Sequence, residues 1–239
     1  MLPRPPRPVN STRALPRAAK TPLTRVGTAT VLLTGFEAFG GETVNPSWLA
    51  VQALHGKSVL GRKIVAAQLP TVFDDSLKVL RDKLNQYQPE LVICVGQAGG
   101  RGAISLERVA LNVNDARIPD NAGAQPVDTP VFAKGPAAYF TGLPIKAMLQ
   151  ALQNQGFPVE VSQTAGTFVC NHVFYGLMHF LATQRGLKAT RGGFIHVPFL
   201  PEQGAPAMPL DEIVLGLKVA VRAALAHTSD VALGGGAIQ

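Results

Sequence analysis

The feature that most constrains the fold is an alternation of short β-branched runs with longer stretches of helical spacing, beginning at Thr30. Six segments have the composition of strands: Thr30–Thr34, Lys63–Leu69, Leu91–Val95, Glu107–Val113, Val159–Ser162 and Gly193–Val197. Five have helical patterns: Pro46–Leu54, Ser76–Tyr87, Ile145–Gln155, a segment from Cys170 onward, and Leu210–Ala226. Strands that alternate with helices form layered α/β folds. The pattern therefore predicts a single-domain three-layer α/β/α sandwich with a largely parallel, mixed central sheet.

Residues 1–28 differ in composition from the rest of the chain. Repeated prolines prevent a continuous helix there, and no apolar periodicity is present. Six Lys or Arg residues precede the first acidic residue, Glu37, and removing them leaves 16 Lys and Arg against 15 Asp and Glu. We expect a disordered basic Pro-rich extension at residues 1–28, a folded domain at residues 29–230 and a flexible tail at residues 231–239.

Charge and apolar patterning exclude several classes of protein. The net charge of +7 is concentrated in the extension, so the nearly neutral body argues against a nucleic-acid partner. Apolar runs such as Leu91–Val95 are too short to cross a bilayer, which predicts no membrane partner. The Arg-rich start resembles an organelle transit peptide, but its prolines interrupt the amphipathic helix that such a peptide needs. No secretory signal is recognisable before Thr28.

Four unusual segments each follow directly on a predicted strand. They are Gly35–Gly41, Gly96–Arg101, Gly166–Asn171 and His196–Gln203. Ligands in open α/β sheets bind beyond the carboxyl ends of the strands. We therefore expect these four segments to meet along one edge of the sheet and to form the functional site there.

The chain has two cysteines in contrasting settings. Cys94 lies within the apolar run Leu91–Val95, which predicts an inert core thiol. Cys170 lies where an irregular segment gives way to an amphipathic helix, and the helix dipole there favours a thiolate. Cys170 is therefore the candidate nucleophile, with a packing role as the alternative. Two cysteines permit neither a disulfide framework nor a multi-thiolate metal site, and they fit a reducing cytoplasm.

A base and an orienting group complete the candidate site. His196 closes an apolar strand just before Pro198, where a histidine needs a hydrogen-bond partner. His172 points roughly 200° away from Cys170 around the helix axis, so the two cannot face each other. Strand alternation places Glu107 on an apolar face, where a carboxylate needs a partner, either a catalytic histidine or a structural cation. Cys170, His196 and Glu107 thus supply nucleophile, base and orienting group for acyl transfer.

Four stretches of the chain resemble the pyroglutamyl peptidase I family, also called the pyrrolidone-carboxylate peptidases. The matching stretches are Thr34–Gly41 with Asn45 and Pro46, Gly96–Arg101 running on to Glu107 and Arg108, Asp115–Asn121, and Ala165–Asn171 followed by Phe194–Pro198. The resemblance covers about Val31 to Ala226, with the motifs in the right order. Ala38 departs from the family pattern, which often has proline at this position.

The resemblance implies a cytoplasmic cysteine peptidase, commonly a homotetramer, that needs no metal or cofactor. It implies removal of N-terminal pyroglutamate from peptides through a thioester acyl-enzyme, so peptides with that N-terminus are the expected partners. The family's triad matches Glu107, Cys170 and His196. Its substrate pocket matches Phe36, Phe39, Asn45 and Gln97, with Arg117 near the site.

Two other interpretations of the sequence remain. Gly96–Arg101 is compatible with an anion-binding loop of a nucleoside phosphorylase or related hydrolase, although it lacks the Lys-Ser/Thr of a P-loop. The basic extension alone suggests a non-catalytic binding module.

Overall fold

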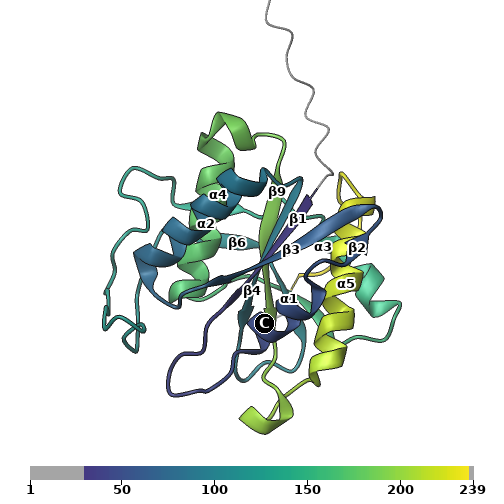
Figure 1. The fold of residues 1–239 in the computed structure, drawn as a ribbon, viewed down its shortest axis with the longest axis horizontal. Helices are drawn as coiled ribbons and strands as arrows, with labels where there is room; N and C mark the ends of the chain where they lie inside the picture. Colours follow the sequence, from purple (N-terminus) through teal and green to yellow (C-terminus); the bar gives the residue numbers. More distant parts are fainter. Residues whose placement is uncertain (1–29, 237–239) are drawn as a thin grey trace, which may run out of the picture.

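A computed structural model of the protein describes residues 30–236, and it has three layers around a central seven-stranded sheet (Figure 1). The strand order is β2-β3-β1-β4-β9-β5-β8. The strands span Thr30–Phe36 (β1), Ser58–Val59 (β2), Arg62–Leu69 (β3), Leu91–Gln97 (β4), Ile104–Glu107 (β5), Val159–Ser162 (β8) and Arg191–Val197 (β9). The central strands β1, β4 and β9 are buried almost throughout, which explains their nearly continuous apolar sequences.

Helices cover both faces of the sheet (Figure 1). One face carries α1 (Pro46–Leu54), α3 (Ile145–Gln153) and α5 (Leu210–Ala226), whose apolar residues form one core cluster with the sheet. The other face carries α2 (Phe73–Tyr87) and α4 (Val169–Thr183), which form a second core cluster. Short 3-10 helices span Arg185–Leu187 and Pro201–Gln203. The predicted single-domain three-layer α/β/α sandwich is confirmed.

Strand directions confirm a mixed sheet and correct one prediction. Strands β3, β1, β4 and β9 are mutually parallel, whereas β5 is antiparallel to β9 and β8 is parallel to β5. The segment Gly166–Asn171 follows β8, so its strand runs opposite to the strands that precede the other three unusual segments. The prediction that all four follow carboxyl ends at one edge is therefore wrong for this segment. Cys170 reaches the site because the loop after Ser162 leads the chain back to the start of α4.

The predicted strand Glu107–Val113 is also wrong, because the chain leaves the sheet at Arg108. Strand β5 ends at Glu107, and β6 (Val109–Leu111) pairs with β7 (Ala138–Phe140) in a separate two-stranded sheet. The carbonyl of Arg108, between the two strands, accepts a hydrogen bond from the backbone N–H of Thr141. Alternation along one strand thus cannot explain the burial of Glu107, which comes from its position at the end of β5.

The ends of the chain are only partly described. The predicted extension at residues 1–28 and the last three residues of the predicted tail lie outside the described residues. Residues 231–236 form neither helix nor strand, and the carbonyls of Leu233 and Gly235 accept hydrogen bonds from Lys146 and Arg108. Within residues 30–236, none of the helices has the length and apolar character needed to span a bilayer.

Candidate active site

Helix α4 presents Cys170 in its first turn. The helix begins after Phe168, and among the described residues no side chain caps its N-terminus. The buried side chain of Asn171 accepts a hydrogen bond from the N–H of Leu111 and donates to the carbonyls of Leu111 and Val113, each at 2.9 Å. These bonds tie the start of α4 to β6. Cys170 therefore sits at a fixed, uncapped helix N-terminus, where backbone N–H groups remain available to an anion.

The thiol of Cys170 lies over Gly96 of β4. A Cβ atom on residue 96 would stand 2.8 Å from Cys170 Sγ, so a glycine is required for this approach. Gly96 is in register with His196 on the neighbouring parallel strand β9. Residues in register project their side chains from the same face of a sheet. The imidazole of His196 and the thiol of Cys170 therefore occupy the same face, one strand apart.

A buried carboxylate is hydrogen-bonded to the imidazole of His196. His196 Nδ1 lies 2.7 Å from Glu107 Oε1, and the two residues are 3% and 0% exposed. An ionised carboxylate only accepts hydrogen bonds, so Nδ1 carries the proton and Nε2 is the basic nitrogen of the neutral ring. The same Glu107 oxygen also accepts from Arg101 Nη1 at 2.8 Å. The two partners that the sequence offered for Glu107, a histidine and a cation, are thus both present.

Opposing influences act on the thiol of Cys170, whose residue is part-buried. Burial raises the pKa of Cys170 to about 12, the charge of Glu107 acts in the same direction, and the charge of Arg101 lowers it. Burial thus opposes the thiolate that the helix N-terminus favours. Loss of the thiol proton then requires a base in the site, and His196 presents an imidazole on the same sheet face.

The remaining thiol and the histidine nearest in sequence have structural surroundings. Cys94 is fully buried in β4, and burial raises its pKa to about 12, which confirms the prediction of a core thiol. His172 Nδ1 lies 2.9 Å from Asn114 Oδ1, and its ring packs edge-on against Phe73. Burial lowers the pKa of His172 to about 4. Neither side chain takes part in the Glu107–His196 pair.

A cavity of about 430 Å³ adjoins the start of α4. It is lined by Phe39, Asp115, Arg117, Ile118, Gly166, Thr167 and Phe168. The rings of Phe39 and Phe168 lie 5.9 Å apart between centroids, and the chain continues from Phe168 directly into the helix that carries Cys170. A mostly apolar cavity with a few polar groups is the usual form of a small-molecule pocket.

Of the five predicted pocket residues, Phe39 and Arg117 line this cavity and the other three do not. Phe36 is 2% exposed and packs against Phe194 in the core. Asn45 is the N-cap of α1, where its side chain accepts from the N–H of Ser47 and donates to the carbonyl of Glu37. Gln97 Oε1 accepts from Gln203 at 3.3 Å. These three residues support the segments around the cavity.

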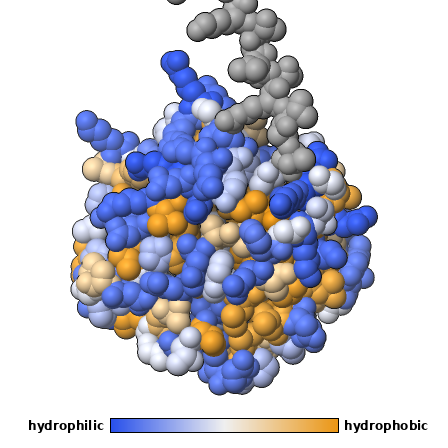
Figure 2. Space-filling model, viewed as in Figure 1, coloured by the Kyte–Doolittle hydropathy of each residue, from blue (hydrophilic) through white to orange (hydrophobic). Residues whose placement is uncertain are grey.

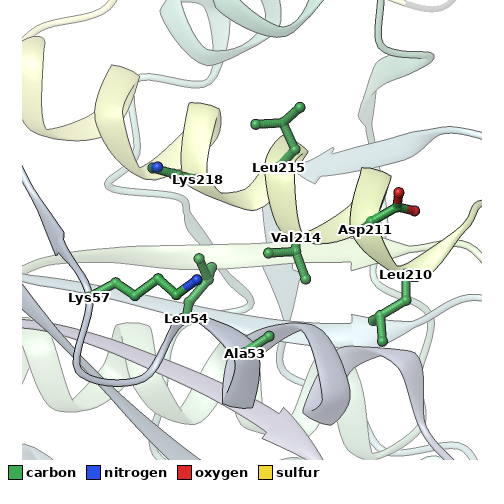
Figure 3. Close-up of a pocket in the computed structure, with 8 residues that line it drawn as sticks. All are labelled: Ala53, Leu54, Lys57, Leu210, Asp211, Val214, Leu215 and Lys218. Atoms are coloured by element: carbon green, nitrogen blue, oxygen red, sulfur yellow. The ribbon is translucent and has the colours of Figure 1, made fainter.

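A larger cavity, of about 630 Å³, lies on the opposite face of the sheet between α1 and α5 (Figure 3). Apolar side chains gather over these helices in Figure 2. Leu54, Leu210, Val214 and Leu215 form much of its wall, with Lys57, Asp211 and Lys218 as its charged groups. It lies on the far face of the sheet from Cys170, whereas the smaller cavity is lined by Gly166, Thr167 and Phe168, which lead into the helix that carries Cys170. The smaller cavity is therefore the candidate site. Among residues 30–236, no group of three His, Cys, Asp or Glu side chains is placed to hold a metal ion.

Three residues of the site were not assigned a role from sequence: Arg101, Phe168 and Asn171. Arg101 and Asn171 lie within the motifs, and each is a polar residue beside an apolar strand or helix start. A polar residue in such a place needs a buried hydrogen-bond partner. That requirement was the signal in the sequence that could have pointed to these two residues. Phe168 immediately precedes the nucleophile helix, but nothing in its sequence context separates a cavity wall from a core residue.

Comparisons with known proteins show the family of the chain. The family model described as pyroglutamyl peptidase matches residues 29–227. A pyrrolidone-carboxylate peptidase of Bacillus cytotoxicus is 52% identical over 87% of this chain and 98% of its own, and one of Klebsiella pneumoniae is 56% identical over 87% and 99%. The crystal structure of pyroglutamyl peptidase I from Bacillus amyloliquefaciens superposes with a TM-score of 0.84 at 52% identity, over 87% of this chain and 100% of that one.

The fold, the uncapped cysteine helix and these matches define a cysteine-type peptidase of the α/β class. The chain belongs to the pyroglutamyl peptidase family, and within it to the pyroglutamyl-peptidase I enzymes. This assignment excludes the phosphorylase interpretation of Gly96–Arg101, whose arginine is bound to Glu107. The binding-module interpretation depends on residues 1–28, outside the described residues.

Proposed function

We propose that this enzyme removes the N-terminal pyroglutamyl group from peptides through a thioester on Cys170, with His196 as base and Glu107 as its orienting carboxylate. The observation that carries the proposal is the buried 2.7 Å hydrogen bond between Glu107 and His196 on the sheet face where the Cys170 thiol sits over Gly96. Nucleophile, base and orienting group in that order are the requirement for acyl transfer by a thiol.

Acylation begins with transfer of the Cys170 proton to His196 Nε2 as sulfur attacks the pyroglutamyl carbonyl carbon. Because burial raises the pKa of the thiol, proton transfer and attack are coupled. Backbone N–H groups of the first turn of α4 stabilise the oxyanion. The tetrahedral intermediate collapses, the C–N bond breaks, and the imidazolium returns its proton to the departing amine. A thioester and a shortened peptide result.

Deacylation uses the same imidazole. His196 Nε2 removes a proton from water, whose oxygen attacks the thioester carbonyl, and the C–S bond then breaks. The sulfur leaves as it regains a proton from the imidazolium, and pyroglutamate is released. Glu107 stabilises the imidazolium in both half-reactions through its hydrogen bond to Nδ1.

The cavity beside α4 suits the acyl group. Pyroglutamate is a small neutral lactam, so its pocket needs flat apolar walls and a few hydrogen-bonding groups. We assign the walls to Phe39 and Phe168, whose rings are in tilted contact, and the rim to Arg117. Phe36, Asn45 and Gln97 contribute by holding β1, α1 and the loop after β4 in place.

The test is hydrolysis of a pyroglutamyl anilide by the intact enzyme and by two matched variants. Cys170→Ser should lose nearly all activity, whereas Cys94→Ser should keep most of it, since Cys94 is buried in the core. Mass spectrometry of the enzyme mixed with substrate should detect the acyl group on the peptide that contains residue 170. Comparable activity in both variants would overturn the nucleophile assignment.

We further propose that the enzyme works in the cytoplasm as a homotetramer. Both cysteines are free thiols, which supports a reducing compartment. The tetramer rests on the family resemblance, and light scattering of the purified protein tests it, because a monomer or dimer at micromolar concentration would contradict it.

A further inference from the structure

Arg101 contacts the catalytic carboxylate from outside the proposed triad. It lies in the loop after β4, and its side chain is 29% exposed. Its Nη1 donates at 2.8 Å to Glu107 Oε1, the oxygen that also binds His196 Nδ1 at 2.7 Å. One oxygen of Glu107 therefore accepts hydrogen bonds from both Arg101 and His196. A shift of the guanidinium would change the position of the oxygen that orients the imidazole.

The same guanidinium reaches the chain that leads to the nucleophile. Nη1 lies 3.3 Å from the hydroxyl of Ser162, and Nη2 donates to the carbonyl of Thr164 at 3.2 Å. Ser162 ends β8, and Thr164 belongs to the loop that returns to the start of α4. Arg101 thus joins three segments that supply the site: the loop after β4, the end of β5 and the loop before Cys170.

Charge balance gives Arg101 a second role. Glu107 is 0% exposed, and an unpaired buried carboxylate is strongly unfavourable. The ionisable groups near the thiol are Cys94 from β4, Glu107 from β5, His196 from β9 and Arg101, with Glu160 of β8 held by Ser105. Glu107 disfavours the Cys170 thiolate and Arg101 favours it. Without Arg101, the negative charge of Glu107 would disfavour the developing thiolate more strongly.

We propose that Arg101 is a positioning residue for the hydrolysis: it fixes the Glu107 oxygen that orients His196 and compensates its charge beside Cys170. This inference rests on the triad proposed above. It assigns Arg101 no contact with substrate. Because a guanidinium supplies parallel donors in a fixed plane, an ammonium at this position keeps the charge but loses the bridge to Ser162 and Thr164.

The experiment uses Arg101→Gln, Arg101→Lys and, as a matched control, Arg62→Gln, which removes the partly exposed ion pair between Arg62 of β3 and Glu90. All are made on full-length Cys94→Ser protein, so that Cys170 is the single thiol. The rate of alkylation by iodoacetamide is measured against pH, together with kcat, KM and the melting temperature. Alkylation reports the thiol directly and does not require turnover.

We expect Arg101→Gln to move the alkylation profile to higher pH and to lower kcat at least tenfold, with a smaller change in KM. Arg101→Lys should return the alkylation profile toward that of the parent while kcat stays reduced. Arg62→Gln should change neither. A purely structural role predicts a lower melting temperature with the parent's alkylation profile and kcat, and that result would overturn the proposal. If Arg101→Gln does not fold, a parental kcat in Arg101→Lys also overturns it.

The experiment distinguishes failure of the proposed triad from failure of the Arg101 proposal. If the triad fails, Cys170→Ser keeps its activity, whatever the Arg101 variants do. Failure of the Arg101 proposal leaves Cys170 essential and its alkylation profile unaffected by Arg101→Gln.

Discussion

Gly96 and Cys170 are in contact across the interface between β4 and α4, and the contact exists because residue 96 has no side chain. A Cβ atom there would stand 2.8 Å from Cys170 Sγ and 2.8 Å from the ring of Phe194. Real Cβ atoms are not found this close to other heavy atoms, so either the thiol or the ring would have to move. The position of the thiol over the sheet is thus set by a glycine on a strand and not by the helix alone.

Gly96→Ala should therefore lower kcat by one to two orders of magnitude, roughly the effect of displacing a reacting atom by about 1 Å. The fold should persist, because overpacking by one methyl costs about 1–3 kcal/mol. Gly186→Ala is the control, since its nearest contact is an ordinary 3.5 Å approach to Gln88. Steady-state kinetics and thermal unfolding of both variants test this, and unchanged kcat in Gly96→Ala would contradict the geometry.

Glu107→Gln tests the orienting carboxylate. The amide keeps the shape of the side chain but removes the negative charge that stabilises the imidazolium and pairs with Arg101. We expect kcat to fall by roughly 10²–10⁴ while the protein still folds. Circular dichroism and kinetics on the same sample separate the two effects. A large drop in melting temperature with kcat preserved would show that Glu107 serves only as a structural ion pair.

The elements of the fold were predictable where burial is uniform. The strands β1, β4 and β9 are buried almost throughout and have mostly apolar sequences, so their existence and the layered architecture follow from sequence. Strand direction was not predictable, because nothing in the sequences of β5 and β8 indicates whether each strand is parallel or antiparallel to the adjacent strand. The break at Arg108 was missed because Glu107–Val113 alternates as a strand would, although tertiary contacts divide it between two sheets.

The candidate reactive residues could be singled out from sequence, whereas their surroundings were less predictable. Cys170, His196 and Glu107 were each recognisable as polar groups in apolar or helix-start contexts, and the structure brings Glu107 and His196 into contact. Phe36 and Phe39 look equivalent in sequence, yet one is core and the other lines the cavity. Phe36 ends β1 and packs against Phe194, whereas Phe39 lies in the following loop, and residue type carries no information on that difference.

Phe39→Ala and Phe36→Ala should therefore separate binding from stability. Loss of the Phe39 wall should raise KM about tenfold or more, in line with ~1–3 kcal/mol for a lost apolar contact with substrate. Loss of the buried Phe36 ring should cost about 3–5 kcal/mol of folding free energy. Denaturant unfolding and steady-state kinetics of both variants provide the comparison. If Phe36→Ala raised KM at unchanged stability, our placement of Phe36 in the core would be wrong.

His172 makes stability depend on pH in the acid range. Burial lowers its pKa from 6.5 to about 4. Between these two pH values, His172 is therefore protonated in the unfolded chain and neutral in the folded chain. Its contribution to stability is complete above pH 6.5 and is lost as pH falls toward 4. At about pH 5, the free energy of unfolding is lower by about 2 kcal/mol than at neutral pH because of this group.

His172→Asn keeps a donor toward Asn114 but removes the titration. Between pH 7.5 and pH 5, the free energy of unfolding of the variant should fall by about 2 kcal/mol less than that of the parent. Urea unfolding at both pH values measures this. Exposed His55, replaced in the same way, is the control. Equal pH dependence in parent and His172→Asn would show that His172 is not the group responsible.

Discrimination between pyroglutamyl and prolyl substrates tests the cavity and not the triad. The two groups have nearly the same shape, but prolyl carries a charged ring amine and lacks the lactam carbonyl. Asp115 and Arg117 both line the cavity, so their charges offset each other and leave the ring ammonium without net compensation. Sites that hydrogen-bond a substrate group reject analogues without it by about 10⁴–10⁵, far more than apolar fit achieves. We therefore expect kcat/KM for prolyl anilide to be lower by about four orders of magnitude. Prolyl turnover within tenfold of pyroglutamyl turnover would contradict the assignment of this cavity as the acyl pocket. It would not contradict the proposed role of the Cys170 thiol.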